Sequence, residues 1–347
     1  MHSASLPDSI ADVEALDDWL SRPSEACVDA LRQHVGDLVV LGVAGKMGPT
    51  LARMAVRASK AVGVTRRVIG VARFSDPAVR RRLDDWGVET IAADLLDRDQ
   101  LARLPDAPLV VYLAGRKFGS TGRESLTWAM NVWLPGLVGE RYRHSRIVAL
   151  STGNVYGNVP VSSGGSIETD LPNPVGEYAM SCLGRERMFE HVSDTHGTPV
   201  ALVRLNYACE LRYGVLVDLA LKVWTGQPVD LAMGHFNVLW QADANAMSLA
   251  AFAACESPAA VVNVTGPEVL SVRDVCEDFG RLLGREPVFE REAAGDALIN
   301  NASAALSRFG SPRVPHSVLM RWIADWIQRG GPLLNKPTHF EVRDGRF

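Results

Sequence analysis

Short apolar runs alternate with longer segments of helical apolar spacing through the first two thirds of the chain. Apolar runs of about four to eight residues, bounded by turns, are typical of buried parallel strands. The alternation therefore predicts a parallel sheet covered by helices on both faces. We expect strands at residues 37–43, 67–72, 109–113, 146–150, 199–203 and 260–264, and helices at 47–61 and 242–254.

A glycine-rich turn follows the first predicted strand and opens a helix. Glycines at this spacing permit a tight turn and a close approach of the backbone to a pyrophosphate, which a helix N-terminus also favours. A glycine triplet alone is weak evidence, but the flanking strand and helix predict dinucleotide binding. Lys46 within the turn either adds charge near a phosphate or is solvated. We expect cofactor contacts from Gly42, Gly45, Lys46, Met47 and Gly48.

The end of the second strand bears on the choice of dinucleotide. An acidic residue there would bind the ribose 2′-hydroxyl of NAD, whereas this chain has Arg73 and Ser75, which suit a 2′-phosphate. This pattern favours NADP slightly over NAD. Asp94, which precedes Leu95 after a later apolar run, is expected to reach the adenine amino group, and both residues are assigned to the cofactor site.

Composition narrows the class of protein. The chain has 347 residues, 47% of them hydrophobic, and a net charge of −4, so it can bury a large core and shows no nucleic-acid footprint. No apolar run approaches the ~20 residues that span a bilayer, and the first residues do not resemble a signal peptide. The scattered cysteines and histidines give no metal-binding pattern. We expect a cytoplasmic protein with a small-molecule substrate and without membrane, nucleic-acid or metal partners.

The chain divides into four parts by pattern. Two helical segments, 12–20 and 25–35, precede the first strand, and the strand–helix rhythm loosens after about residue 206. We therefore expect an α/β fold: a Rossmann-type doubly wound parallel sheet with a smaller C-terminal substrate-binding region. The expected parts are a helical extension (1–36), an NAD(P)-binding domain (37–205 plus about 240–266), a substrate-binding region (206–239 and 267–330) and an ordered or semi-ordered tail (331–347).

Several short motifs now give the chain a family resemblance. It resembles the extended short-chain dehydrogenases/reductases, the family of NAD(P)-dependent sugar epimerases and dehydratases. Each motif is short, but their order and spacing together are specific. The extension and the tail lie outside the pattern. The motifs are the glycine loop, Asp94-Leu95, Leu113-Ala114-Gly115, Asn131-Val132, Ser151-Thr152-Gly153-Asn154-Val155-Tyr156-Gly157, Tyr178 with Glu186, and Arg204-Leu205-Asn206.

The resemblance implies roles for individual residues. Tyr178 matches the general acid/base, Thr152 the residue that hydrogen-bonds the substrate oxygen, and Asn131 a position near the active site. Gly153 and Asn154 stand where sugar-nucleotide dehydratases carry an Asp-Glu pair, which argues against 4,6-dehydration. Leu113, Ala114 and Gly115 are expected to border the cofactor, and Asn154, Arg116, Asn206 and Tyr207 to contact the substrate.

One family residue is missing. The Tyr-x-x-x-Lys motif has Cys182 in place of lysine. In the family, that lysine holds the nicotinamide ribose and lowers the tyrosine pKa, which is otherwise about 10. Three interpretations stay open. Another cation, Lys117 first or Arg116 second, replaces the lysine; the protein binds the nucleotide without hydride transfer, as a sensor or interaction protein; or Cys182 participates as a thiolate. Under the first two, Cys182 packs on the cofactor side.

These observations together predict oxidoreductase or epimerase chemistry by hydride transfer, with Tyr178 exchanging the proton. The expected substrate is a hydroxylated, sugar-like small molecule: a sugar, a sugar acid or a sugar nucleotide. The resemblance also implies a homodimer formed through the helix that bears Tyr178 and the helix before it. Residues 126–143 are apolar enough to contribute to such an interface.

Overall fold

A seven-stranded parallel sheet organises the protein. The computed structural model describes residues 6–117, 119 and 122–345. The strands lie in the order β12-β7-β5-β4-β1-β2-β3, and every neighbouring pair is parallel. The order runs outward in both directions from β1 and β4, which confirms the doubly wound α/β fold. The strands are β1 (Leu38–Leu41), β2 (Val68–Ala72), β3 (Glu89–Ala92), β4 (Leu109–Tyr112), β5 (Arg146–Thr152), β7 (Val200–Leu205) and β12 (Ala260–Val264).

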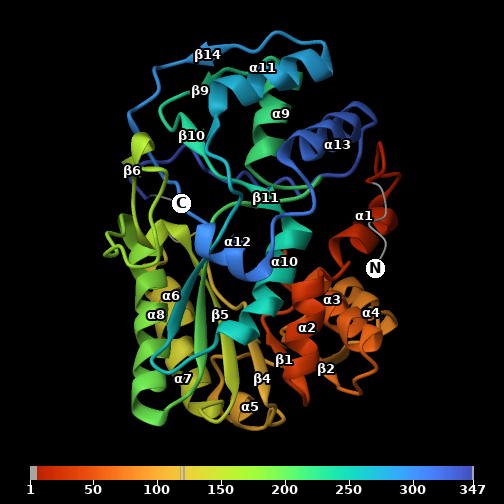
Figure 1. Ribbon diagram of the computed structural model, residues 1–347, viewed down its shortest axis with the longest axis vertical. Coiled ribbons are helices and arrows are strands. Elements are labelled where there is room, and N and C mark those ends of the chain that lie inside the picture. Colours follow the sequence, from red (N-terminus) through yellow and green to blue (C-terminus); the bar gives the residue numbers. More distant parts are fainter. Residues whose placement is uncertain (1–5, 118, 120–121, 346–347) are drawn as a thin grey trace.

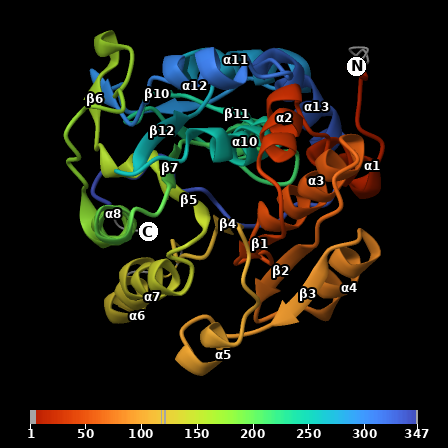
Figure 2. The ribbon, with the colours of Figure 1, turned by 60° about the horizontal axis from the view of Figure 1, so that its bottom comes forward.

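Helices cover both faces of the sheet (Figure 2). Alternate residues of each strand enter two separate cores: Val40 and Val111 face one, and Val39 and Val110 face the other. This alternation is what a strand buried on both faces requires. One face is covered by α2 (Glu25–Gln33), α3 (Gly48–Ala61) and α10 (Gln241–Ala250), and the other by α5 (Arg98–Ala102), α7 (Leu134–Arg141) and α8 (Gly176–His196).

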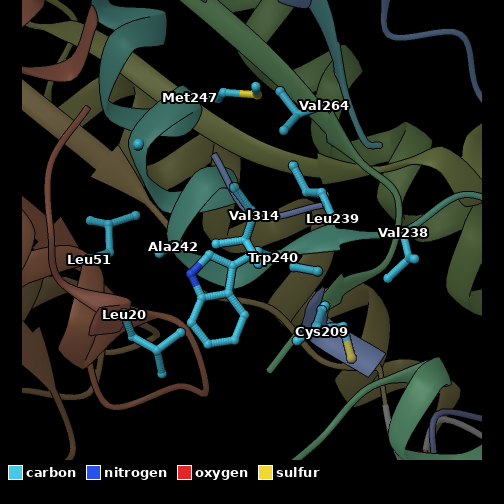
Figure 3. Packing of buried hydrophobic residues seen from close by; sticks show 14 of the residues in the cluster. Leu20, Leu51, Cys209, Val238, Leu239, Trp240, Ala242, Met247, Val264 and Val314 are labelled. Atoms are coloured by element: carbon cyan, nitrogen blue, oxygen red, sulfur yellow. The ribbon is translucent and has the colours of Figure 1, made fainter. Parts of the chain in front are cut away.

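The N-terminal helices pack into the first core. Asp12 caps α1 (Val13–Leu20) and Ser24 caps α2, each by accepting a backbone N–H. Leu20 is buried near Trp240, whose indole lies among apolar side chains from distant segments (Figure 3). Asp17 forms an ion pair of 3.1 Å with Arg212. The extension is therefore part of the core, and its first five residues lie outside the described part.

A smaller region covers the C-terminal edge of the sheet (Figure 1). It contains α9 (Val215–Thr225), α11 (Val272–Leu283) and α13 (His316–Gln328) with short strand pairs. The remaining elements are α4 (Pro77–Asp85), α6 (Glu124–Trp128), η1 (Ala129–Trp133), η2 (Gly153–Val155), β6 (Val159–Pro160), η3 (Val161–Ser163), β8 (Ala208–Cys209), β9 (Val229–Asp230), β10 (His235–Phe236), β11 (Leu239–Trp240), η4 (Ala251–Ala254), β13 (Leu270–Ser271), β14 (Phe289–Glu290), β15 (Asp296–Ala297) and α12 (Ser303–Phe309). None of the described helices has the length and apolarity needed to cross a membrane.

The C-terminal segment after α13 returns to the boundary between the two parts (Figure 1). Phe340 is buried with its ring centroid 6.1 Å from that of Phe236. Arg343 pairs with Asp296 at 2.6 Å. The segment therefore reaches the end of the sheet at which the predicted site residues gather.

Candidate active site

A cavity of about 280 Å³ lies between the C-terminal edge of the sheet and the smaller region. Ligand sites of doubly wound sheets occur at this edge. Residues from both parts line it, together with one residue of the tail. They are Gly42, Gly45, Lys46, Met47, Gly48, Leu113, Lys117, Leu150, Ser151, Thr152, Asn154, Tyr178, Leu205, Asn206, Tyr207, Ala208, Tyr213, Gly214, Val215 and Thr338.

The glycine loop forms one wall of the cavity, as expected for a dinucleotide cradle. Gly42 has φ +86°, and a Cβ there would lie 2.7 Å from the Ala114 backbone nitrogen. A Cβ at Gly48 would lie 2.2 Å from the Val43 carbonyl oxygen. Helix α3 begins at Gly48 without a side-chain cap. Gly48 N donates to Gly45 O over 3.2 Å and Pro49 has no N–H, so the helix dipole, rather than a row of free N–H groups, favours an anion here. These features fit the pyrophosphate of NAD or NADP.

Tyr178 and Thr152 meet on the opposite side. Tyr178 lies in the first turn of α8 and Thr152 ends β5, and both side chains line the cavity. Asn154 Nδ2 donates to Thr152 Oγ1 over 2.8 Å, which fixes the threonine hydroxyl. Burial raises the pKa of Tyr178 well above its ordinary value, and the Cys182 thiol adds to this, while Arg185 and Thr152 act to lower it. The phenol is therefore protonated near neutral pH.

Cys182 lies one helical turn after Tyr178, within a small apolar cluster. Its side chain is fully buried in a cluster with Val155 and Tyr156, and Tyr178 packs against this cluster. Burial raises the pKa of the Cys182 thiol above its usual value, although Arg185 opposes this shift. A neutral packed thiol is what these surroundings favour, and they argue against a thiolate nucleophile.

Buried polar contacts fix the position of α8. Glu186 accepts hydrogen bonds from the Arg204 guanidinium on β7, the shortest being 2.7 Å, and from the Ser151 hydroxyl on β5. The side chains of the ion pair are 4% and 0% exposed. Because a buried charge needs a partner, this pair ties α8 to two strands and sets the position of Tyr178.

Asn131 lies in a turn of π-helix, η1, and its amide is fully engaged. Its Oδ1 accepts from Arg116 N and Arg185 Nη2, at 2.8 and 2.9 Å. Its Nδ2 donates to Arg116 O and Ser181 Oγ, both at 2.9 Å. Asn131 is completely buried and therefore positions the loop after β4. π-Helical turns are common at functional sites because they redirect a side chain.

Lys117, which that loop carries, enters the cavity. Its Nζ lies 5.9 Å from the Tyr178 ring centroid and donates to the Thr338 carbonyl over 3.1 Å. Burial lowers the pKa of Lys117 to about 8. Arg116 turns away: it donates to Gly119 O over 2.7 Å and does not line the cavity. Of the two cations considered as replacements for the missing lysine, Lys117 is the one near Tyr178.

Lys46 crosses the cavity toward the substrate-binding region. Its Nζ donates to Ala208 O over 2.9 Å and lies 4.0 Å from the Tyr213 ring centroid. Lys46 was expected at the cofactor; two residues that were expected at the substrate, Asn206 and Tyr207, follow β7. Asn206 is buried and donates to Leu298 O, and Tyr207 has φ +47°. A non-glycine residue in this conformation is strained, which is common at functional sites.

The other predicted cofactor residues do not line this cavity. Arg73 is exposed after β2, Asp94 Oδ1 accepts from Leu96 N over 3.0 Å, and Leu95 is buried in the second core. The Ala114 backbone packs closely against Gly42, and the Arg185 guanidinium packs closely against Gly115. Within the described ranges, no group of three His, Cys, Asp or Glu side chains is arranged to bind a metal.

Comparison with known families agrees with this geometry. The model of the NAD dependent epimerase/dehydratase family matches residues 38–209, which run from β1 to β8 and include the glycine loop and Tyr178. The chain belongs to the NAD-dependent epimerase/dehydratase family. The match ends where the smaller region begins, so the smaller region and the tail are outside the matched segment. A search of curated proteins finds no match.

Several solved structures, epimerases among them, have the same fold as this family member. UDP-glucuronic acid 4-epimerase from Bacillus cereus, in complex with NAD, is 19% identical with a TM-score of 0.70, over 84% of this chain and 99% of that one. UDP-glucose 4-epimerase from Thermus thermophilus, in complex with NAD, is 21% identical with a TM-score of 0.68, over 84% and 99%. MoeE5 in complex with UDP-glucuronic acid and NAD is 22% identical with a TM-score of 0.67, over 85% and 100%.

Several cavity residues of this family member were not expected from its sequence, and two of them contact the cavity lysines. Tyr213 stacks beneath Lys46, and Thr338 contributes its carbonyl to Lys117. Thr338 is held by Asp218, whose Oδ2 accepts from its N–H over 2.7 Å and from its hydroxyl over 2.6 Å. The sequence contains no motif for either residue. The available signal for Thr338 was the pair of polar residues Thr338 and His339 in an otherwise irregular tail.

Proposed function

We propose that the protein is an NAD(P)-dependent oxidoreductase or epimerase that acts on a hydroxylated, sugar-like small molecule. One observation carries the proposal. Tyr178 and Thr152 line a cavity whose other wall is a glycine loop that fits a dinucleotide pyrophosphate. The family membership and the epimerase folds support the same chemistry.

In the proposed mechanism Tyr178 exchanges a proton with the substrate oxygen at its phenolic Oη. Thr152 orients that oxygen, and Asn154 holds the threonine hydroxyl in place. The bound dinucleotide supplies or accepts hydride. Lys117 places its ammonium 5.9 Å from the Tyr178 ring centroid, while Arg185 lowers the pKa of Tyr178 and offsets part of the effect of burial.

The choice between NAD and NADP depends on Arg73 in our proposal. Arg73 is exposed directly after β2, where a ribose-binding acid occurs in NAD enzymes. The next carboxylate, Asp76, caps α4 by accepting from Ala78 N over 2.8 Å. Arg73 thus favours NADP, whereas the similar solved structures are complexes with NAD.

The proposal is tested on purified protein. Mass spectrometry of the released nucleotide identifies any dinucleotide that co-purifies, and titration compares NADPH with NADH. Sugars, sugar acids and UDP-sugars are then screened for a change at the nicotinamide absorbance band. We expect turnover of at least one hydroxylated substrate, and Arg73→Ala should weaken NADPH binding but not NADH binding. A clear wild-type preference for NADH would overturn the NADP assignment.

A nucleotide-binding sensor is the second candidate, favoured by one observation. Cys182 takes the place of the family lysine, and the pKa of Tyr178 is raised well above its ordinary value by burial. An uncharged thiol cannot reverse that shift. Tight dinucleotide binding without turnover of any sugar-like compound, in protein that keeps its fold, would support this candidate over the enzyme.

We also propose a homodimer through α6, η1, α7 and α8. An apolar hollow on this face is bordered by Trp128, Val132, Trp133 and Met188. Trp128 and Trp133 are 39% and 52% exposed, which is unusual for such large side chains. A second copy of the same face would cover them.

A further inference from the structure

The charge lining the cavity is of one sign. Among the described residues that line it, Lys46 and Lys117 are ionisable to cations, and none is an aspartate or glutamate. A lining of this kind attracts an anionic ligand, because a low-dielectric wall strengthens the interaction between the ligand and the two cations.

Lys46 does not face the phosphate-binding turn. Its ammonium donates to Ala208 O and lies over the Tyr213 ring, both of which belong to the segment after β7. Its charge is therefore placed at the substrate end of the cavity. Lys117 enters the cavity from the loop after β4, with its ammonium near Tyr178 and the tail.

Nearby carboxylates are held by other partners. Glu210 bonds Arg212 over 3.1 Å, Asp218 accepts two hydrogen bonds from Thr338, and Glu341 pairs with Lys222 at 4.0 Å. The pKa of each lysine is lowered to about 8, chiefly by burial, and Lys117 contributes to the shift at Lys46. A bound anion near both ammonium groups would raise the pKa of each lysine, because an opposite charge favours the protonated form.

We propose that Lys46 and Lys117 form an anion subsite that binds a carboxylate of the substrate next to the hydroxyl that reacts at Tyr178. The substrate class is then a sugar acid, free or nucleotide-linked, rather than a neutral sugar. This inference rests on the proposed function, because that function supplies the hydroxyl that reacts at Tyr178. The binding of the carboxylate is measurable without turnover, so the two proposals fail separately.

The test measures ligand binding by calorimetry to protein saturated with dinucleotide. A hexuronic acid is compared with its neutral hexose, and UDP-glucuronic acid with UDP-glucose. Loss of a hydrogen bond to a charged group corresponds to about 10-fold to 100-fold in affinity. We expect Lys46→Gln and Lys117→Gln each to weaken acid binding by this factor and to leave neutral sugars unchanged. Lys60→Gln, which removes an exposed lysine on α3, is the matched control.

Lys117→Arg keeps the charge and should retain most of the preference for acids. This variant covers the case in which Lys117→Gln does not fold. Affinity for the acid, but not for the neutral sugar, should fall as the pH rises through about 8, where both ammonium groups lose their protons. Other ionisable groups facing Lys46 are Glu210, Cys209 and Arg212, and those facing Lys117 are Cys182, Asp218 and Glu341.

Two results would overturn the subsite. Equal affinity for each acid and its neutral counterpart would show that the two lysines do not bind the carboxylate. Equal weakening of UDP-glucose and UDP-glucuronic acid in the lysine variants would assign the charge to the diphosphate instead. Lysine-dependent acid binding without turnover would keep the subsite and remove the proposed enzymatic function.

Discussion

Replacing Glu186 with glutamine should destabilise the protein and displace Tyr178. The substitution keeps the size of the side chain but places an amide NH₂ against the Arg204 guanidinium, which is held by Glu186 at 2.7 Å. The Arg204 side chain is 4% exposed, so water cannot replace the lost carboxylate oxygen. Removing one partner of a buried ion pair costs about 3–5 kcal/mol.

That loss is large against the total of about 5–15 kcal/mol that stabilises typical folded proteins. The assay is urea unfolding followed by tryptophan fluorescence, with dinucleotide binding as a second readout of the native state. Asp106→Asn is the matched control. It breaks an ion pair to Arg141 in which the aspartate is 93% exposed, and such pairs contribute about 1 kcal/mol or less.

Glu186→Gln should also lower turnover more than dinucleotide affinity, because Glu186 holds α8 against β5 and β7 while the glycine loop lies on β1 and α3. An unfolding free energy within about 1 kcal/mol of the Asp106→Asn variant would refute the reasoning. It would mean that the buried pair contributes no more than a surface pair.

Three further predictions concern the cradle, the thiol and the proposed interface. Gly48→Ala should weaken dinucleotide binding by at least about tenfold in a titration, since the added Cβ meets the Val43 carbonyl; Gly295→Ala, where nothing lies within 4 Å, should not. Cys182→Ala should change turnover less than about threefold, because a buried neutral thiol contributes packing only. A collapse of turnover with intact cofactor binding would give the thiol a chemical role. Trp133→Glu should give a monomer by light scattering at micromolar concentration, and a wild-type monomer would count against the interface.

Most of the fold could be predicted because its signals are local. The expected strand at residues 260–264 coincides with β12, and the helix at 47–61 differs from α3 by one residue at its start. Apolar runs, the glycine loop and the strand–helix alternation all follow from neighbouring residues. The short strand β3 was not assigned, because Glu89–Ala92 is only partly buried at the sheet edge and its apolar run is short and interrupted by polar residues.

The site could be predicted only where a residue is held by its own element. Thr152 and Tyr178 lie at the end of a strand and the start of a helix, so motif spacing places them together. The direction of Lys46 depends on Ala208, which is 162 positions away, and that of Lys117 on Thr338, which is 221 positions away. Contacts of such long range leave no local pattern, which is why Thr338 was not anticipated.

The most direct test of the central claim is transfer of deuterium between the dinucleotide and a substrate. Protein saturated with reduced dinucleotide carrying deuterium at both C4 positions is incubated with the ketone form of each candidate substrate, which accepts hydride, and label in the resulting sugar is read by mass spectrometry. We expect label transfer by the wild type and a loss of about 10²-fold to 10⁴-fold in Tyr178→Phe, with dinucleotide affinity unchanged. Transfer at the wild-type rate in Tyr178→Phe would contradict the assignment of Tyr178 as the acid/base.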